Sequence, residues 1–304
     1  MSLLRQITRL FDEPPPEFAF EISAEGIAWA RTNQPAALQW APLPADVLSV
    51  TPVKDNVLRA DVFAEFIDRL APRNGNRKVR RAALVLPDYC ARVSVIDFDT
   101  FPTDTQEQLA LLRFRMKRMV PFDVDTAIIN FHAQPRGGVS KKTDVLVAAV
   151  AAEVAGPYEQ PFRNAGYYPG FVTLSALSAL SLDDEPGAGP TSGPSVFVKL
   201  SGRALAVAVL SGGKVRLFRS VELPDASAEE VLDVLFPTFA FVEDELGERP
   251  GLVRLCGFPR LDQTERQRWS DAFGIPVSMV RSRFGVPSAG NSGLLGYLEM
   301  QEVA

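Results

Sequence analysis

The chain has 304 residues, of which 46% are hydrophobic and 23% charged, so it is long and apolar enough for two compact lobes with their own cores. Its net charge of −5 argues against a general nucleic-acid-binding protein, because affinity for phosphate backbones comes mainly from lysine and arginine. The two cysteines, Cys90 and Cys256, lie far apart and lack metal-ligand spacing, which argues against both a disulfide framework and a zinc site.

Residues 1–16 are predicted to form an amphipathic segment followed by a proline-rich link. Leu3, Ile7 and Leu10 share one helical face, and two arginines interrupt the apolar pattern, which is not that of a signal peptide. Such a basic helix can lie on an anionic membrane surface, or it can pack on its own domain or bind a partner. Because no apolar run approaches the ~20 residues that a membrane span needs, we expect a cytoplasmic protein.

Residues 17–182 are predicted to form a first lobe. Phe18, Phe20 and Ile22 alternate along a strand, and the turn at Ala24-Glu25-Gly26 leads into a second strand. Apolar residues then recur at helical spacing. The expected opening elements are strands at 17–23, 26–32, 37–43 and 82–87, with a helix at 60–70 before the last of them.

The stretch from Phe101 to Asp123 predicts a helix with defined ends. Thr103 followed by Gln106 resembles a capping box, and Pro121 stops the helix. Apolar residues between these ends predict one buried stripe, made of Leu109, Leu112, Met116 and Met119. The basic residues beside the stripe are expected to face water or a partner; they are Arg113, Arg115, Lys117 and Arg118.

Further strands are expected around this helix, so that residues from about 92 to 166 form a strand-helix-strand-strand module inserted into the first lobe. The strands are predicted at 92–98, 126–132 and 143–150. After the module, a helix at 153–165, a short strand at 167–172 and a helix around 174–180 complete the lobe.

Residues 183–194 contain no apolar residue larger than Ala188 and are predicted to be a flexible crossing. Beyond it the opening pattern recurs, so residues 195–304 are predicted to form a second lobe. Its expected strands are 195–200, 204–210, 215–223, 252–256 and 277–280, and its expected helices are 227–246, 262–273 and 293–300. The fold class is therefore α/β with two similar halves.

Several short motifs resemble the PilM family of type IV pilus assembly proteins, which are actin-like and related to FtsA. The motifs are Leu86-Pro87, Phe101-Pro102, Val120-Pro121-Phe122 and Leu294-Leu295-Gly296. The resemblance implies a two-lobed actin-like fold of duplicated ribonuclease-H-like halves. It also implies a nucleotide cleft between the lobes, with a phosphate-binding turn in each lobe and a glycine-rich segment for the adenosine.

The residues at these positions depart from the family pattern. In the first lobe, Glu21, Ser23 and Gly26 take the expected places, but Ala24 and Glu25 replace a small polar turn. Glu25 would repel a triphosphate. In the second lobe the departures are larger, and the corresponding residues are Lys199, Ser201, Gly202 and Gly257.

Lys199 stands where the resemblance implies a metal-organising aspartate, so the charge is reversed. Gly257 is a single glycine where two or three would receive adenosine. Lys199 and Arg203 could still hold a phosphate without metal. We expect no cofactor and no metal, with ATP disfavoured, and no enzyme activity; His132, the single histidine, has no nucleophile motif near it.

The sequence therefore predicts a non-catalytic, PilM-like cytoplasmic scaffold, peripheral to the inner membrane, of a type IV pilus or related secretion platform. The resemblance implies that it docks the short cytoplasmic tail of a PilN-like membrane protein, with other pilus platform components as further partners. The expected docking residues, at the edge of the inserted module, are Arg113, Val120, Phe122 and Val124. Alternatives are an active actin-like ATPase and a GspL-like component of type II secretion; nucleic-acid binding has only the basic run 73–81 behind it.

Overall fold

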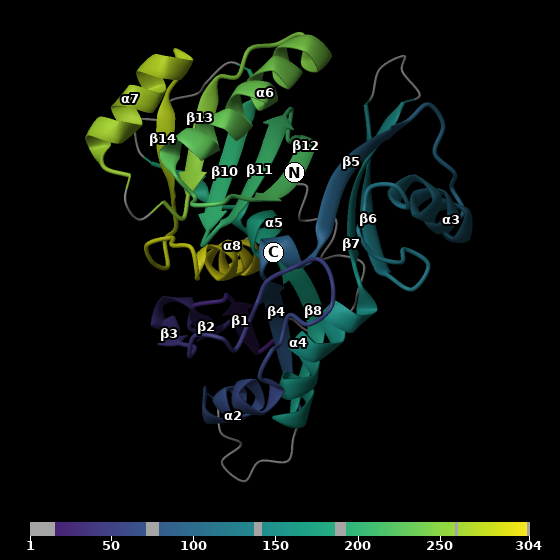
Figure 1. Ribbon diagram of the computed structural model, residues 1–304, viewed down its shortest axis with the longest axis vertical. Coiled ribbons are helices and arrows are strands. Elements are labelled where there is room, and N and C mark those ends of the chain that lie inside the picture. The colour runs from purple at the N-terminus through teal and green to yellow at the C-terminus, as the bar shows by residue number, and fades with distance from the viewer. Residues whose placement is uncertain (1–15, 71–78, 137–141, 186–192, 259–260, 303–304) are drawn as a thin grey trace.

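The computed structural model describes residues 16–70, 79–136, 142–185, 193–258 and 261–302 (Figure 1). They form two lobes stacked one above the other, with a smaller module beside the second lobe. The predicted segment 1–16, apart from its last residue, and the basic run from Arg73 to Lys78 lie outside the described residues. Among the described residues, none of the helices combines the length and apolar character that a membrane crossing requires.

The first lobe is built on a five-stranded sheet of order β3-β2-β1-β4-β8, in which β1 pairs antiparallel to β2 and parallel to β4. Its strands are β1 (Phe18–Ile22), β2 (Gly26–Arg31), β3 (Gln39–Pro42), β4 (Arg80–Leu86) and β8 (Tyr167–Leu174). Its helices are α2 (Ala60–Leu70), α4 (Ala152–Asn164) and α5 (Ser175–Ala179), with the short helices η1 (Pro35–Ala37) and η2 (Asp88–Cys90). These bounds confirm the predicted order of elements.

Each face of this sheet is covered by helices. On one face Phe20 packs against Phe162 of α4, with ring centroids 5.0 Å apart, and Phe63 of α2 joins the same cluster. On the other face, small side chains of β1, β2 and β4 meet Leu294 and Tyr297 of the last helix, α8 (Ser292–Glu302). The C-terminal helix of the chain thus belongs to the first lobe's packing, although the sequence placed it in the second lobe.

The inserted module is a three-stranded antiparallel sheet of order β5-β7-β6 covered by α3. Its elements are β5 (Arg92–Phe98), α3 (Thr105–Met116), β6 (Ile128–Pro135) and β7 (Thr143–Val150). Helix α4 follows directly but packs on α2 and β8 of the first lobe. The module therefore ends near residue 150, earlier than the predicted 166.

The central helix differs from its prediction at both ends. Asp104, not Thr103, is the N-cap, and its carboxylate accepts from the backbone N–H groups of Gln106 and Glu107. The helix ends at Met116, so Met119 leaves the predicted stripe and is 46% exposed. Leu112 and Met116 are fully buried as predicted. Asp104 takes the N-cap position in place of Thr103 because its charged oxygen is a stronger hydrogen-bond acceptor than the threonine hydroxyl.

The second lobe is a six-stranded sheet of order β12-β11-β10-β13-β14-β9, with α6 and α7 beside it (Figure 1). Its strands are β9 (Asp183–Asp184), β10 (Ser195–Ser201), β11 (Ala204–Ser211), β12 (Lys214–Glu222), β13 (Leu252–Cys256) and β14 (Val277–Arg281). Its helices are α6 (Ala228–Leu246) and α7 (Gln263–Phe273). The start of the predicted flexible crossing is ordered, because Asp184 pairs with β14 and its carboxylate binds Arg254 at 2.5 Å.

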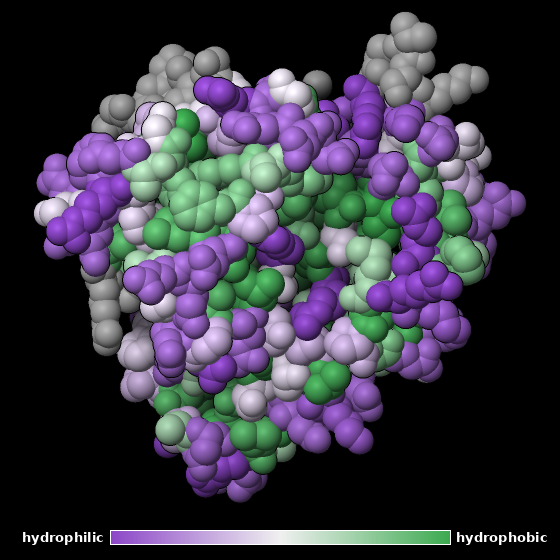
Figure 2. Space-filling model, turned by 45° about the horizontal axis from the view of Figure 1, so that its top comes forward, coloured by the Kyte–Doolittle hydropathy of each residue, from purple (hydrophilic) through white to green (hydrophobic). Residues whose placement is uncertain are grey.

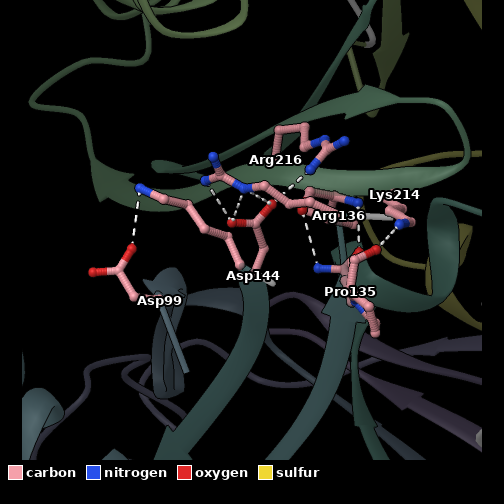
Figure 3. Close-up of polar contacts among 9 residues, drawn as sticks. Asp99, Pro135, Arg136, Asp144, Lys214 and Arg216 are labelled. Atoms are coloured by element: carbon pink, nitrogen blue, oxygen red, sulfur yellow. Dashed lines mark hydrogen bonds and ion pairs between the residues drawn. The ribbon is translucent and has the colours of Figure 1, made fainter. Parts of the chain in front are cut away.

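The module also contacts the second lobe, where β5 lies along β12 (Figure 1). The side-chain amide of Gln134 donates to the carbonyl of Val215 at 3.1 Å and accepts from its N–H at 2.9 Å. Beside it, the buried carboxylate of Asp144 accepts from Arg136 of the module and from Arg216 of β12 (Figure 3). The module is therefore fixed to the second lobe as well as to the first.

Candidate functional site

The two turns that the sequence analysis singled out face each other between the lobes. In the first lobe, the hydroxyl of Ser23 donates to the carbonyl of Gly26 and accepts from its N–H, which closes the β1–β2 turn. In the second lobe, Gly202 lies in the β10–β11 turn with a positive φ of 57°. The carboxylate of Glu25 lies 3.5 Å from the position that a Cβ atom on residue 202 would occupy. The predicted residues of both turns are thus brought together.

Below the turns, a buried ion pair joins the lobes. The ammonium of Lys199, at the end of β10, lies 2.8 Å from a carboxylate oxygen of Asp88, and both side chains are at most 2% exposed. The other oxygen of Asp88 accepts from the backbone N–H of Ala176. Glu21 of β1 completes the group as a second buried carboxylate beside Lys199.

Glu21 is held by groups from two helices. One of its oxygens accepts from the hydroxyl of Ser175, and the other accepts from the backbone N–H of Leu294 at 2.7 Å. Burial raises the pKa of Glu21, although Lys199 and these hydrogen bonds act in the opposite direction. Burial would lower the pKa of Lys199, but the carboxylates of Asp88 and Glu21 outweigh it, so that pKa is raised and the ammonium stays charged.

The space between the two turns is taken by the chain itself. The segment before α8 runs through it, and the hydroxyl of Ser201 donates to the carbonyl of Ala289 at 3.2 Å. A side chain on Gly290 would begin 3.4 Å from the hydroxyl of Ser23. Gly257 has a φ of +75° and lies against the carbonyl of Leu200, so a side chain there would overlap the backbone. The segment before α8 therefore packs against both turns.

This arrangement does not fit a magnesium nucleotide. Mg²⁺ is held by carboxylates and water, whereas here an ammonium already neutralises Asp88 and lies beside Glu21. No group of three or more potential ligands gathers elsewhere in the described part of the chain. The backbone at Ala289 also lies against Ser201 and Gly257, where phosphates would need room. What the residues can do is fix the lobes to each other.

Sequence reasoning missed Asp88, Ser175 and the segment around Ala289. A signal for Asp88 was present, since it follows the end of β4, a strand that pairs parallel to β1. Carboxyl ends of adjacent parallel strands meet at one edge of a sheet, so an acidic residue there lies near Glu21. The contacts of Ser175 and Ala289 depend on packing between distant segments, for which the sequence carries no local signal.

The predicted docking residues surround the loop after α3. Val124 is 1% exposed, while Val120 and Phe122 are half-buried against the apolar cluster of the module. The guanidinium of Arg113 donates to the backbone carbonyls of this loop. Its observed contacts hold the loop against α3, so its removal would disturb the module itself.

Two strands, one in the module and one in the first lobe, lie at the edges of their sheets. In the described residues, β6 ends the module sheet and β8 ends the first-lobe sheet, each with one unpaired side. Large apolar side chains are exposed on both edges, with Ile128 of β6 at 50%, Tyr168 of β8 at 46% and Val172 of β8 at 39%. Hydrophobic and hydrophilic areas alternate over the surface that is seen when the top of the molecule is tipped forward (Figure 2).

No family model matches the sequence, and no curated protein matches it. Among solved structures, the fold is similar to the PilM-PilN type IV pilus biogenesis complex, with a TM-score of 0.67 and 16% identity over 96% of this chain and 100% of that one. It is also similar to a Bacteroides thetaiotaomicron protein with an actin-like ATPase fold and unknown function, with a TM-score of 0.54 and 11% identity over 91% and 94%.

A third similar structure is the cytoplasmic domain of EpsL, an inner membrane component of the type II secretion system of Vibrio cholerae. Its TM-score is 0.50 at 13% identity, over 94% of each chain. At such identities the likeness concerns the fold alone. The expected fold class is confirmed: the chain has the two-lobed actin-like fold, with a three-stranded module and its helix inserted into the first lobe.

Proposed function

We propose that this protein is a non-catalytic scaffold, peripheral to the inner membrane, that docks the short cytoplasmic tail of a PilN-like membrane protein within a pilus or secretion platform. The observation that carries the proposal is the pair of open strand edges, β6 and β8, with exposed apolar side chains. The likeness to a PilM-PilN complex over the full length of that chain supports it.

An extended peptide suits such edges for a physical reason. Unpaired backbone groups of an edge strand can bind the backbone of an added strand, and side chains beside the edge then select its sequence. On β6, Ile128 and Asn130 alternate outward with the half-buried side chains that pack on α3. The exposed residues of β6 and β8 are therefore better placed to contact a peptide than Val124, which is buried, or Arg113, whose guanidinium binds the loop after α3.

We expect Ile128→Asp to weaken peptide binding at least about tenfold, because it places a charge in a contact that should bury apolar surface. The probe is a fluorescent peptide of the cytoplasmic tail of a single-span protein encoded beside this chain, titrated in an anisotropy assay. The matched control is Phe114→Asp, since Phe114 is 75% exposed on the outer side of α3. Equal affinity of Ile128→Asp and the unmodified protein, with loss in the control, would place docking on α3 instead.

The non-catalytic part of the proposal is supported by the buried Lys199–Asp88 pair and by the loop that lies between the two turns. Binding a magnesium nucleotide would require both to move. Moving them would leave Asp88 or Lys199 without its partner until water could enter, which is costly for buried charges.

We therefore expect titration calorimetry with ATP and magnesium to give a Kd weaker than about 1 mM, with no metal-dependent hydrolysis. Micromolar affinity that is lost on Lys199→Ala would show instead that Lys199 binds phosphate. Hydrolysis that requires magnesium would favour the active ATPase alternative. If neither the tail peptide nor a nucleotide bound, the non-catalytic part of the proposal would stand, but the proposed partner would be wrong.

A further inference from the structure

We propose that Lys199 is a built-in cross-link that holds the two lobes at one fixed closure. The inference does not depend on the docking proposal, because it concerns only contacts within the chain. It assigns to one side chain the role of joining the lobes.

The cross-link joins groups from different parts of the fold. Lys199 is carried by the second lobe, whereas Asp88 and Glu21 are carried by the first. The three residues are 1–4% exposed. Helices α5 and α8 add backbone donors, with Ala176 bound to Asp88 and Leu294 bound to Glu21. Two carboxylates and one ammonium thus share a buried space, in which each of the four carboxylate oxygens accepts a hydrogen bond.

The energetic role of such a pair is to select a geometry. A buried ion pair adds little net stability, because taking both charges out of water offsets their attraction. A small separation of the lobes, too narrow for water, would nevertheless leave Lys199 and Asp88 unpaired in a medium of low dielectric constant. Partial opening is therefore penalised, and one angle between the lobes is favoured.

Apolar packing across the lobes supports the same closure. A single hydrophobic cluster runs from Phe20 and Leu84 in the first lobe to Phe197 and Cys256 in the second. The module adds polar contacts to the second lobe at a distance from Lys199, through the amide of Gln134 and through the pair of Asp144 with Arg216 (Figure 3). A lobe rotation would have to break all of these contacts together.

Backbone hydrogen exchange tests the cross-link. The backbone N–H groups of Ala176 and Leu294 donate to the two carboxylates within the first lobe, on the side that Lys199 of the second lobe covers, so their exchange should quicken when the lobes part. In Lys199→Met, which removes the charge but keeps an unbranched side chain, we expect exchange at both amides to quicken at least about tenfold, while Val207 in the core of β11 changes little. Arg59→Met, which breaks an exposed pair within one lobe, is the control.

Unchanged exchange at Ala176 and Leu294 in Lys199→Met would overturn the inference. So would equal quickening at Val207, because the pair would then support the whole fold rather than the closure. If Lys199→Met does not fold, Asp88→Asn replaces it, since the amide oxygen can still accept from Ala176. In the unmodified protein, millimolar ATP with magnesium should leave these exchange rates unchanged; added protection there would show that a ligand, and not Lys199, sets the closure.

Discussion

Met116→Asp is expected to unfold the inserted module, with a loss of more than about 4 kcal/mol in its free energy of unfolding. Met116 is fully buried against the module sheet, in a cluster with Phe98, Leu112 and Val147. Urea titration followed by circular dichroism measures the loss.

The matched control for this change is Phe114→Asp, two residues earlier on the same helix. Phe114 is 75% exposed, so the same carboxylate remains in water there. Its expected cost is about 0.5 kcal/mol, from negative charge near the C-terminal end of the helix. If the two variants melted alike, α3 would face the sheet with a different side from the one described.

Gly296→Ala is expected to destabilise the protein by about 2–3 kcal/mol or more, because a methyl group there has no room. Gly296 lies where α8 crosses α5, and a side chain would overlap the backbone carbonyl of Ser178. A backbone atom cannot turn aside as a side chain can, so the two helices would have to separate. Thermal unfolding of the variant tests the expectation.

Gly156→Ala provides the comparison, since Gly156 is also inside a helix but has no atom near the position of an added methyl group. Alanine is favoured over glycine in helices by up to about 1 kcal/mol, so this variant should be as stable as the parent or more stable. A similar loss in both variants would show that the close approach of α5 and α8 is not what limits residue 296.

The sequence predicted local elements well because they follow local rules. The strands β5, β7 and β13 begin and end at their predicted residues, and the α2 helix spans its predicted residues. Long-range packing was less predictable. The return of α8 to the first lobe, and the pairing of Asp184 with β14, depend on segments distant in sequence.

For the candidate site, the sequence identified the charge reversal at Lys199 but not its partner. The pattern places Glu21 and Lys199 in corresponding positions of two similar halves, and the structure brings them together. Asp88 was not singled out, because one acidic residue after a strand is common and its significance comes from the lobe that packs above it. The predictions for nucleotide binding and for docking residues stay predictions until the binding experiments are done.

The contact between Gln134 and Val215 has a consequence for solubility. Strand β12 ends the second-lobe sheet, and an open edge of nine residues is a template for pairing with another chain. Gln134 satisfies both backbone groups of Val215, as a neighbouring strand would, and β5 lies along the same edge. The module thus covers an edge that could pair with another chain. A truncated chain without the module would therefore aggregate even if both lobes could still fold.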